Sequence, residues 1–373
     1  MELDEKLDIL APAARFDACD SYSRQGRRYT PRSAGWGDTA VATESGPDGR
    51  AMPTFRLLMS SRCAWNCPYC PLRAGGDPPR AALEPEELAR TFLPRHERGT
   101  VQGLFLSSAV DGDVAHANNR MLDGIEHLRR HHSFGGYVHV KLLPGASAGD
   151  IERAARLASR VSINLEAPNA ARLAHISPER RWDADLIAPL VLARDWQRAG
   201  ALPAGLATQF VVGAAGESDS ELLSSAGWLY RELAMRRIYY GAFRPAAGTP
   251  LADLEPTPFI RSRRLQEADW LLRHYEYGEA ELPYDSAGNL PLHLDPKLAW
   301  ALAHAEFFPV ELNTATEQEL LRVPGLGPTG IRRIMRLRRE HRFREPAHLA
   351  ALGSAAGRAR DFVTFDGRFF GRP

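Results

Sequence analysis

The feature that most constrains the fold is a repeated alternation of strand-like and helix-like segments along the chain. Six apolar, β-prone segments recur, and helical patterns separate and follow them. The predicted strands are residues 55–60, 101–108, 137–143, 160–166, 207–212 and 238–243, and the predicted helices are residues 85–96, 118–131, 148–159, 183–199, 217–235 and 258–277. Because parallel neighbours need helical crossovers, this order predicts an α/β fold with a parallel sheet buried on both faces.

Composition excludes several other classes of protein. The chain has 373 residues, of which 44% are hydrophobic and 25% are charged, and these ordinary values exclude a mostly disordered chain. No apolar run approaches the roughly 18 residues that span a bilayer. The first ten residues are acidic and lack the pattern of a secretory signal. We therefore expect a cytoplasmic protein without a membrane partner, in which thiols stay reduced.

Three of the four cysteines lie close together. Cys63, Cys67 and Cys70 have three and then two residues between them, whereas Cys19 stands apart. A tetrahedral zinc site needs a fourth ligand at similar spacing, and the nearest downstream histidine is His96. Three thiolates on one loop can instead hold three irons of a four-iron cluster and leave the fourth iron open to a non-protein ligand. A structural zinc site and, less favoured in this compartment, disulfides stay open as alternatives.

This spacing, with Tyr69 just before the last cysteine, resembles that of the radical S-adenosylmethionine superfamily. The resemblance implies that Cys63, Cys67 and Cys70 ligate a 4Fe–4S cluster, with Tyr69 among the residues that contact the cofactor. The open iron would chelate the amino and carboxylate groups of S-adenosylmethionine, whose reductive cleavage gives a 5′-deoxyadenosyl radical. The resemblance also implies a partial (β/α)6 TIM-like barrel and an electron donor such as flavodoxin or ferredoxin.

Candidate site residues follow the predicted strands, because catalytic groups of α/β barrels lie at the carboxyl ends of the strands. Ser107 and Ser108 end the second strand, where relatives carry a Gly-Gly-Glu-like stretch that binds the methionine amino group. On the fourth strand Ser162, Asn164 and Glu166 share one face, because strand side chains alternate. The resemblance makes Asn164 and Glu166 cofactor ligands. The alternative is a polar face on an edge strand.

The remaining strand ends carry weaker candidates. Gly213 opens residues 213–217, a glycine-containing stretch similar to one that lies near the adenine in relatives. Lys141 ends the third strand and could bind a carboxylate or phosphate, although a solvated lysine is the commoner use. Tyr239, Tyr240 and Arg244 on the sixth strand suit a pocket for a base and a phosphate, with simple packing as the alternative.

Charge divides the chain into two parts. From residue 309 to the end there are 12 arginines and no lysine against 7 acidic residues, whereas the rest has 35 basic and 39 acidic residues. A compact basic tail on an acidic body favours binding of a polyanion. A solvated basic helix face is the alternative.

Two short helices are predicted in this tail, at residues 317–321 and 329–340, joined by Val323-Pro324-Gly325-Leu326-Gly327-Pro328. The arrangement resembles the helix–hairpin–helix motif of nucleic-acid-binding proteins. The resemblance implies that Gly325, Gly327 and Thr329 let backbone amides approach a phosphate. The charge contacts would come from Arg332, Arg333, Arg336 and Arg339. A protein-binding helical hairpin is the alternative.

The complete architecture resembles a subfamily of radical S-adenosylmethionine proteins described as DNA modification or repair proteins. We expect an N-terminal extension (residues 1–53), a barrel (54–280), a connecting segment (281–308) and a small all-α helix–hairpin–helix domain (309–373). Residues 16–21, which include Cys19, could cap the cluster or contact substrate. The expected function is radical modification or repair of a nucleotide or base in DNA. The alternatives are a radical RNA-modification enzyme and a non-catalytic iron–sulfur DNA-binding protein.

Overall fold

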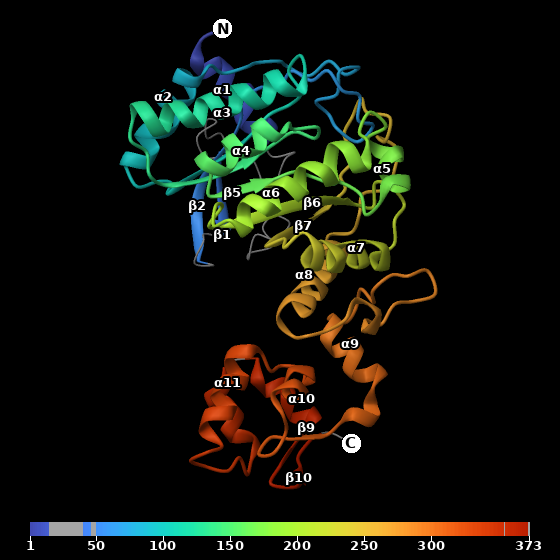
Figure 1. Ribbon diagram of the computed structural model, residues 1–373. Coiled ribbons are helices and arrows are strands. Elements are labelled where there is room, and N and C mark those ends of the chain that lie inside the picture. Colours follow the sequence, from blue (N-terminus) through green and yellow to red (C-terminus); the bar gives the residue numbers. More distant parts are fainter. Residues whose placement is uncertain (15–39, 46–49, 354, 372–373) are drawn as a thin grey trace. The chain divides into compact units, whose positions relative to one another are not determined.

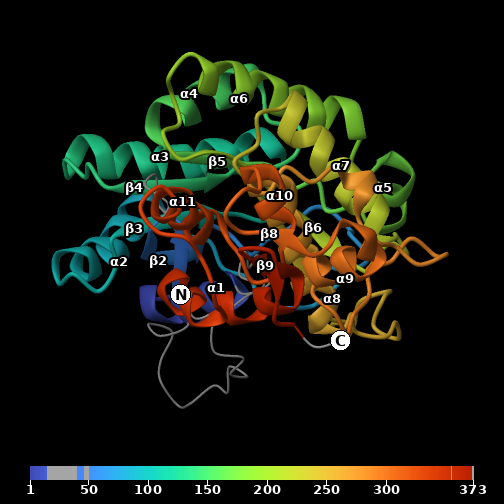
Figure 2. The same cartoon turned by 90° about the horizontal axis from the view of Figure 1, so that it is seen from below.

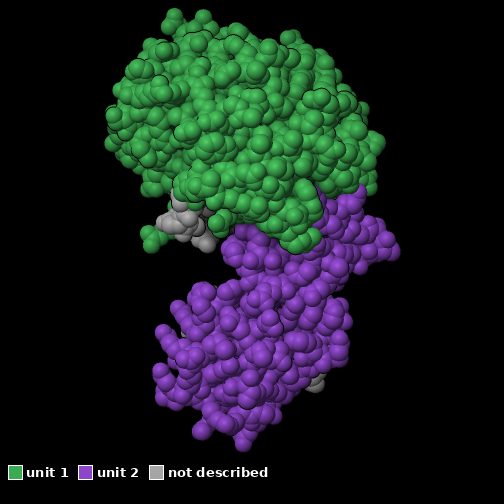
Figure 3. All heavy atoms as spheres, viewed as in Figure 1, with its two compact units in different colours: residues 1–217, 228–262 green, residues 218–227, 263–373 purple. Residues whose placement is uncertain are grey.

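The computed structural model describes residues 1–14, 40–45, 50–353 and 355–371. These residues form two compact units, which Figure 3 distinguishes by colour. Unit 1 consists of Met1–Glu217 and Trp228–Ser262, and unit 2 consists of Ser218–Gly227 and Arg263–Pro373. No helix in the described ranges is both long enough and apolar enough to cross a membrane.

Unit 1 is built on a seven-stranded sheet whose strands lie in chain order from β1 to β7 (Figure 1). The strands are β1 (Val41–Ser45), β2 (Ala51–Leu58), β3 (Gly103–Ser107), β4 (Tyr137–Lys141), β5 (Arg160–Ser162), β6 (Gly205–Val212) and β7 (Arg237–Ala242). Strands β2 to β7 are parallel, which confirms the predicted six-stranded partial barrel. The antiparallel edge strand β1 was not predicted, because its five residues carry no continuous apolar run.

Helices precede, connect and follow the strands of this sheet. They are α1 (Leu3–Ala13), α2 (Pro85–Glu97), α3 (Val114–His131), α4 (Ala148–Leu157), α5 (Ala170–Ile176), the π-helical η3 (Trp182–Ile187), α6 (Ala188–Arg198), α7 (Asp219–Glu232) and α8 (Phe259–His274). In Figure 2, α2, α3, α4 and α6 follow one another in an arc outside the strands. Local sequence explains where several of these helices begin. Asp113 caps α3, Ser147 and Asp150 form a capping box on α4, and Pro85 occupies the first turn of α2.

The two faces of the sheet differ in character. Phe55 of β2 packs against Phe92 of α2, with ring centroids 6.3 Å apart, and both rings are fully buried. Burial of such side chains contributes about 1.5–3 kcal/mol each, so this outer layer is a main source of stability. On β4, by contrast, Tyr137, His139 and Lys141 alternate with buried valines. The inner face therefore carries polar side chains.

Unit 2 combines short helices with a small sheet. Its further elements are η4 (Glu279–Glu281), α9 (Pro296–Ala303), η5 (Ala305–Phe307), β8 (Val310–Glu311), α10 (Glu317–Arg322), α11 (Pro328–Leu337), η6 (Pro346–Leu352), η7 (Ala356–Phe362), β9 (Val363–Phe365) and β10 (Arg368–Phe369). The two predicted tail helices are present, but the expectation of an all-α tail was wrong. The three strands escaped prediction because two or three residues give no alternating pattern.

Candidate active site

The three clustered cysteines lie on the loop that follows β2, at the carboxyl end of the parallel strands. Hydrogen bonds to backbone carbonyls hold this loop in place. The Ala64 amide donates to the Val110 carbonyl at 2.8 Å, and Arg80 Nη1 donates to the carbonyls of Ser61 at 2.6 Å and Leu72 at 2.7 Å. All three cysteines are free thiols, so none of them is in a disulfide.

The loop opens into a cavity at the carboxyl ends of β2 to β6. About 860 Å³ of space lies between its walls, including the part open to solvent. Its polar and sulfur-bearing walls are Cys63, Cys67, Tyr69, Cys70, Arg73, Ser108, Lys141, Asn164, Glu166, Arg180 and Gln209. The cavity therefore brings together the three cysteines, Tyr69, Ser108, Asn164 and Glu166, all of which the sequence had nominated as site residues.

An ion pair lies beside the cysteines. Arg180 Nη1 is 3.5 Å from Glu166 Oε1, and Arg180 Nη2 is 3.9 Å from Cys67 Sγ. The guanidinium lies over the Trp65 ring, 5.3 Å from its centroid. Burial acts to lower the pKa of Arg180, but neighbouring Tyr69, Cys67 and Glu166 more than offset it and hold the pKa above its ordinary value. Arg180 therefore places a permanent positive charge in the cavity.

The segment after β5 turns the Glu166 carboxylate into this site. Strand β5 ends at Ser162, yet the chain stays beside β6: the Glu166 amide donates to the Gln209 carbonyl at 2.9 Å, and the Val211 amide donates to the Glu166 carbonyl at 2.8 Å. Glu166 has a φ of 63°, in a region that costs a residue with a side chain about 1–3 kcal/mol. Asn164 Nδ2 donates to Glu166 Oε1 at 3.2 Å. Such stored strain concentrates at functional sites.

Several polar atoms in this region are buried without a hydrogen-bond partner among the described residues. They are Ser107 Oγ, Asn164 Oδ1, Glu166 Oε2, Gln209 Oε1, and Nε and Nη1 of Arg180. Each such atom costs about 1–3 kcal/mol unless something binds it. The set offers acceptors from Asn164 and Glu166 and donors from Arg180. It therefore fits a zwitterion such as the methionine part of S-adenosylmethionine.

Burial governs the ionisation of two of the three thiols. Burial raises the pKa of Cys70 to about 12 and also raises the pKa of Cys67, whose Sγ lies 3.1 Å from Ser177 Oγ. Buried thiols ionise when a metal binds them. Within the described ranges, no three Cys, His, Asp or Glu side chains converge to hold a metal ion, and the choice between an iron–sulfur cluster and a zinc ion stays a prediction.

The two candidate serines differ in their surroundings. Ser108 lines the cavity, and its Oγ donates to the Ala109 carbonyl at 2.8 Å. Ser107 is 1% exposed, and its hydroxyl has no hydrogen-bond partner within the described residues. Ser107 does not line the cavity, whereas Ser108 lines it with its hydroxyl already donating to a carbonyl. Their role as cofactor ligands stays a prediction.

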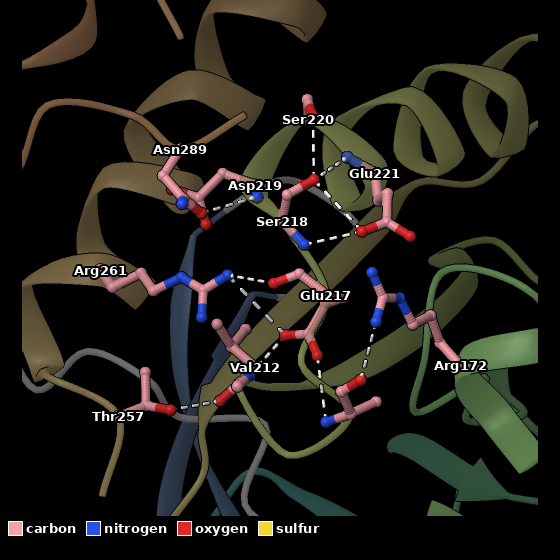
Figure 4. A network of polar contacts seen from close by, with 12 residues as sticks. Arg172, Val212, Glu217, Ser218, Asp219, Ser220, Glu221, Thr257, Arg261 and Asn289 are labelled. Atoms are coloured by element: carbon pink, nitrogen blue, oxygen red, sulfur yellow. Dashed lines mark hydrogen bonds and ion pairs between the residues drawn. The ribbon is translucent and has the colours of Figure 1, made fainter. Parts of the chain in front are cut away.

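Gly213 lies in the turn after β6 and is not among the residues that line the cavity. Its amide and that of Ala215 both donate to the Glu217 carboxylate, the second at 3.1 Å, while Arg261 Nη2 donates to the Glu217 carbonyl at 2.7 Å (Figure 4). Gly213 has a φ of 92°, and a Cβ there would stand 2.0 Å from Thr257 Oγ1. The turn itself therefore requires this glycine, and its proximity to an adenine stays a prediction.

Of the other strand-end candidates, only one lines the cavity. Lys141 lines the cavity, with Nζ 5.6 Å from the centroid of the Phe105 ring. Tyr239 and Tyr240 are buried but do not line it, and Arg244 is exposed outside it. Tyr239 Oη accepts from Arg160 Nη1 at 3.4 Å. Cys19 and residues 16–21 lie outside the described residues.

Sequence analysis missed three polar residues of the cavity, Arg73, Arg180 and Gln209. Gln209 shares one face of β6 with Val211, which also lines the cavity, so the period of two could have placed it on the inner face. Arg180 lies between α5 and η3, where no periodic pattern tells where a side chain points. The neighbouring sequence does not distinguish Arg180 from the adjacent Arg181 as a site residue.

The predicted nucleic-acid contacts lie in unit 2, around the hairpin between α10 and α11. Gly325 has a φ of 86°, and a Cβ there would stand 2.7 Å from the Ala355 carbonyl oxygen. Gly327 is the N-cap of α11. Thr329, Arg332, Arg333, Arg336 and Arg339, the predicted contact residues, are exposed on or just after that helix, as is Glu340. Arg338 instead donates to the Ala315 carbonyl at 2.6 Å and is structural. Nucleic-acid binding by this surface stays a prediction.

No protein-family model matches the chain, and a comparison with curated sequences finds no relative. Among solved structures it is similar to methylornithine synthase, with 14% identity, a TM-score of 0.48, and coverage of 58% of this chain and 60% of that one. It is also similar to HydG, a maturase of the FeFe-hydrogenase, with 15% identity, a TM-score of 0.48, and coverage of 58% of this chain and 48% of that one. A third similar structure is a radical SAM methyltransferase from Sphaerobacter thermophilus, with 15% identity, a TM-score of 0.44, and coverage of 60% of this chain and 68% of that one. The matched region spans less than two thirds of the first two structures.

Proposed function

We propose that this chain is a radical S-adenosylmethionine enzyme. One observation carries the proposal: three free thiols share a cavity with an unpaired carboxylate oxygen and a permanent guanidinium, at the carboxyl ends of parallel strands. Cys63, Cys67 and Cys70 would hold a 4Fe–4S cluster. Glu166 would accept from the amino group of S-adenosylmethionine, and Arg180 would donate to its carboxylate.

When bound, the cluster supplies the electron that splits S-adenosylmethionine into methionine and a 5′-deoxyadenosyl radical, which takes a hydrogen atom from the substrate. The chain's own part is to bind, orient and shield. Apolar residues of the cavity wall, among them Leu58, Leu72 and Leu143, exclude water from a reactive species. The electron would come from an external reduced donor such as flavodoxin or ferredoxin, in the reducing cytoplasm that the free thiols favour.

The test is anaerobic reconstitution with iron and sulfide, followed by reduction in the presence of S-adenosylmethionine. We expect the wild-type chain to release 5′-deoxyadenosine and the Cys67→Ala variant to release none. Cluster absorption is recorded for both proteins, so that incomplete loading is not mistaken for inactivity. If fully loaded wild type releases no more 5′-deoxyadenosine than the variant, the protein is not an enzyme of this kind.

For the substrate, we propose a nucleotide or base in DNA. The support is the exposed basic surface of α11 beside a glycine hairpin, which suits phosphate contacts. A base would have to leave the duplex to approach a radical inside the barrel. Replacing Arg332, Arg333 and Arg336 by Gln should lower the slope of log affinity against log salt by about 2.7, or about 0.9 per lost contact. An unchanged slope for DNA and for RNA of the same sequence would remove the support for a nucleic-acid substrate.

The reaction product can be sought in cells. Nucleosides from the DNA of a deletion strain and of its parent are compared by mass spectrometry. A modified nucleoside that disappears, or a damaged one that accumulates, would identify the target. Restoring the wild-type chain, but not Cys67→Ala, should return the parental pattern.

A further inference from the structure

The cavity of unit 1 is lined by an arginine, Arg73, to which the proposed function gives no role. Arg73 follows the last cysteine of the loop, Cys70, and its side chain forms part of the cavity wall. Its Nε is buried and has no hydrogen-bond partner within the described residues. No carboxylate in the described part of the chain forms an ion pair with its guanidinium. Arg73 therefore brings a positive charge to the cavity that the protein itself does not neutralise.

The loop holds Arg73 in position. The Ala74 amide donates to the Trp65 carbonyl at 2.7 Å, and Arg80 Nη2 donates to the Arg73 carbonyl at 2.7 Å. The guanidinium lies close to Gly75, because a Cβ added there would stand 3.2 Å from both Nη1 and Nη2 of Arg73. A side chain that is already packed against its own loop loses less freedom when a ligand binds.

S-adenosylmethionine does not account for this charge. Its anionic group is a carboxylate, which the proposed function pairs with Arg180. Arg180 also has a counter-ion in the protein, because its Nη1 lies 3.5 Å from Glu166 Oε1, whereas Arg73 has none among the described residues. A cavity that keeps a positive charge in excess favours a second ligand that is an anion. The substrate is the ligand that remains to be placed.

A second unassigned group lies on a different wall of the cavity. Gln209 lines the cavity and is 5% exposed, and its Oε1 is buried without a hydrogen-bond donor within the described residues. Gln209 belongs to β6, whereas Arg73 follows β2, and the strands β3, β4 and β5 lie between them. A buried amide oxygen is costly unless an N–H of a ligand donates to it. The cavity therefore offers a cation on one wall and a hydrogen-bond acceptor on another.

We propose that Arg73 and Gln209 bind the substrate: Arg73 holds a phosphate of the target nucleotide, and Gln209 accepts a hydrogen bond from an N–H of its base. The planar fork of a guanidinium matches a phosphate, and a glutamine amide matches the edge of a base. Trp65, which also lines the cavity, adds an aromatic ring of the kind on which bases stack. This inference rests on the proposed nucleotide substrate and gives unit 1 its own means of recognising it, apart from the tail.

The test measures binding of small ligands to the full-length, reconstituted protein in saturating S-adenosylmethionine. The 2′-deoxynucleoside 5′-monophosphates and the matching nucleosides are compared by equilibrium dialysis, for wild type, Arg73→Gln and Gln209→Leu. Arg62→Gln is the control for the first variant, because Arg62 is exposed on the same loop and does not line the cavity. Gln102→Leu is the control for the second, because Gln102 is exposed just before β3. Thermal unfolding of each variant checks that the fold is intact.

We expect wild type to bind at least one monophosphate about tenfold more tightly than its nucleoside, as one charge-assisted hydrogen bond predicts. Arg73→Gln should remove this difference, because it removes the phosphate contact. Gln209→Leu should weaken the binding of both ligands about fivefold and keep their ratio, because the base is common to both. Arg62→Gln and Gln102→Leu should match wild type.

Three results would overturn the inference: monophosphates that wild type binds no better than nucleosides, an unchanged ratio in Arg73→Gln, or wild-type affinities in Gln209→Leu. Loss of affinity for S-adenosylmethionine in Arg73→Gln, as large as its loss for the monophosphate, would instead place Arg73 at the cofactor and would also overturn it. Release of 5′-deoxyadenosine is recorded in parallel. Its absence from fully loaded wild type would overturn the proposed radical chemistry, whereas the ligand affinities test Arg73 and Gln209 independently of it.

Discussion

Arg180 offers the sharpest test of the candidate site, through the substitution Arg180→Gln. Its Nε and Nη1 are buried without a hydrogen-bond acceptor within the described residues, and its pKa is held above the ordinary value, so it stays charged. Two charge-assisted hydrogen bonds to the carboxylate of S-adenosylmethionine contribute about 3 kcal/mol. Losing both should raise the Kd for S-adenosylmethionine about 100-fold. Arg180→Lys keeps the charge but not the planar fork, so we expect a smaller rise of about tenfold.

The assay is equilibrium dialysis of S-adenosylmethionine against anaerobically reconstituted protein. Arg181→Gln is the matched control: it makes the same change one residue later, where the side chain is 77% exposed and pairs with Asp185. Iron content and cluster absorption must match wild type, because Arg180 Nη2 lies 3.9 Å from Cys67 Sγ. A Kd within about threefold of wild type in a fully loaded Arg180→Gln protein would refute the assignment, since that change is far below the value of two hydrogen bonds.

A double-mutant cycle separates binding from folding. Glu166 is 6% exposed, and Arg180→Gln leaves its carboxylate without the ion pair. Removing one partner of a buried pair costs about 3–5 kcal/mol in the free energy of unfolding. We expect the double variant Arg180→Gln/Glu166→Gln to be more stable in urea than Arg180→Gln alone, although it should still bind S-adenosylmethionine weakly.

Three further predictions concern stability and turns. Burial alone would raise the pKa of Glu44, but His139, Arg160 and Arg56 outweigh it and lower the pKa to about 2, against 4.5 ordinarily. This shift adds about 3 kcal/mol to the free energy of unfolding above pH 4.5, and the contribution is lost as the pH falls towards 2. Urea unfolding of Glu44→Gln should therefore lack that acid dependence. Gly325→Ala should weaken DNA binding and lower the melting temperature, since its Cβ would meet the Ala355 carbonyl, whereas Gly357→Ala, with open space around it, should do neither. Gly213→Ala should destabilise the turn after β6 by about 1 kcal/mol or more, measured by urea unfolding, and a neutral result would contradict the clash with Thr257.

The parts of the site that could be predicted from sequence are those encoded by local patterns. The cysteine spacing is contained within eight residues, and the period of two placed Asn164 and Glu166 on one face even though β5 itself is only three residues long. Arg180 belongs to an irregular segment, and its position beside Cys67 depends on how α5 and η3 pack against the barrel. Contacts between residues more than a hundred positions apart leave no local trace in the chain.

The inner face of the sheet also shows why a familiar arrangement of residues need not be a site. Ser162 Oγ lies 2.8 Å from His139 Nε2, and His139 Nδ1 lies 2.9 Å from Glu44 Oε2, which is the order of a nucleophile, a base and an acid. Ser162 is 1% exposed and does not line the cavity, so no substrate can approach its hydroxyl. Burial lowers the pKa of His139, and the ring donates one N–H to the Glu44 carboxylate. Since Glu44 comes from the edge strand β1 and the other two from β4 and β5, the chain of hydrogen bonds ties that edge strand across the barrel. His139 shares a strand face with Lys141, and Ser162 shares one with Asn164, so the network lies next to the cavity walls that Lys141 and Asn164 form and supports them.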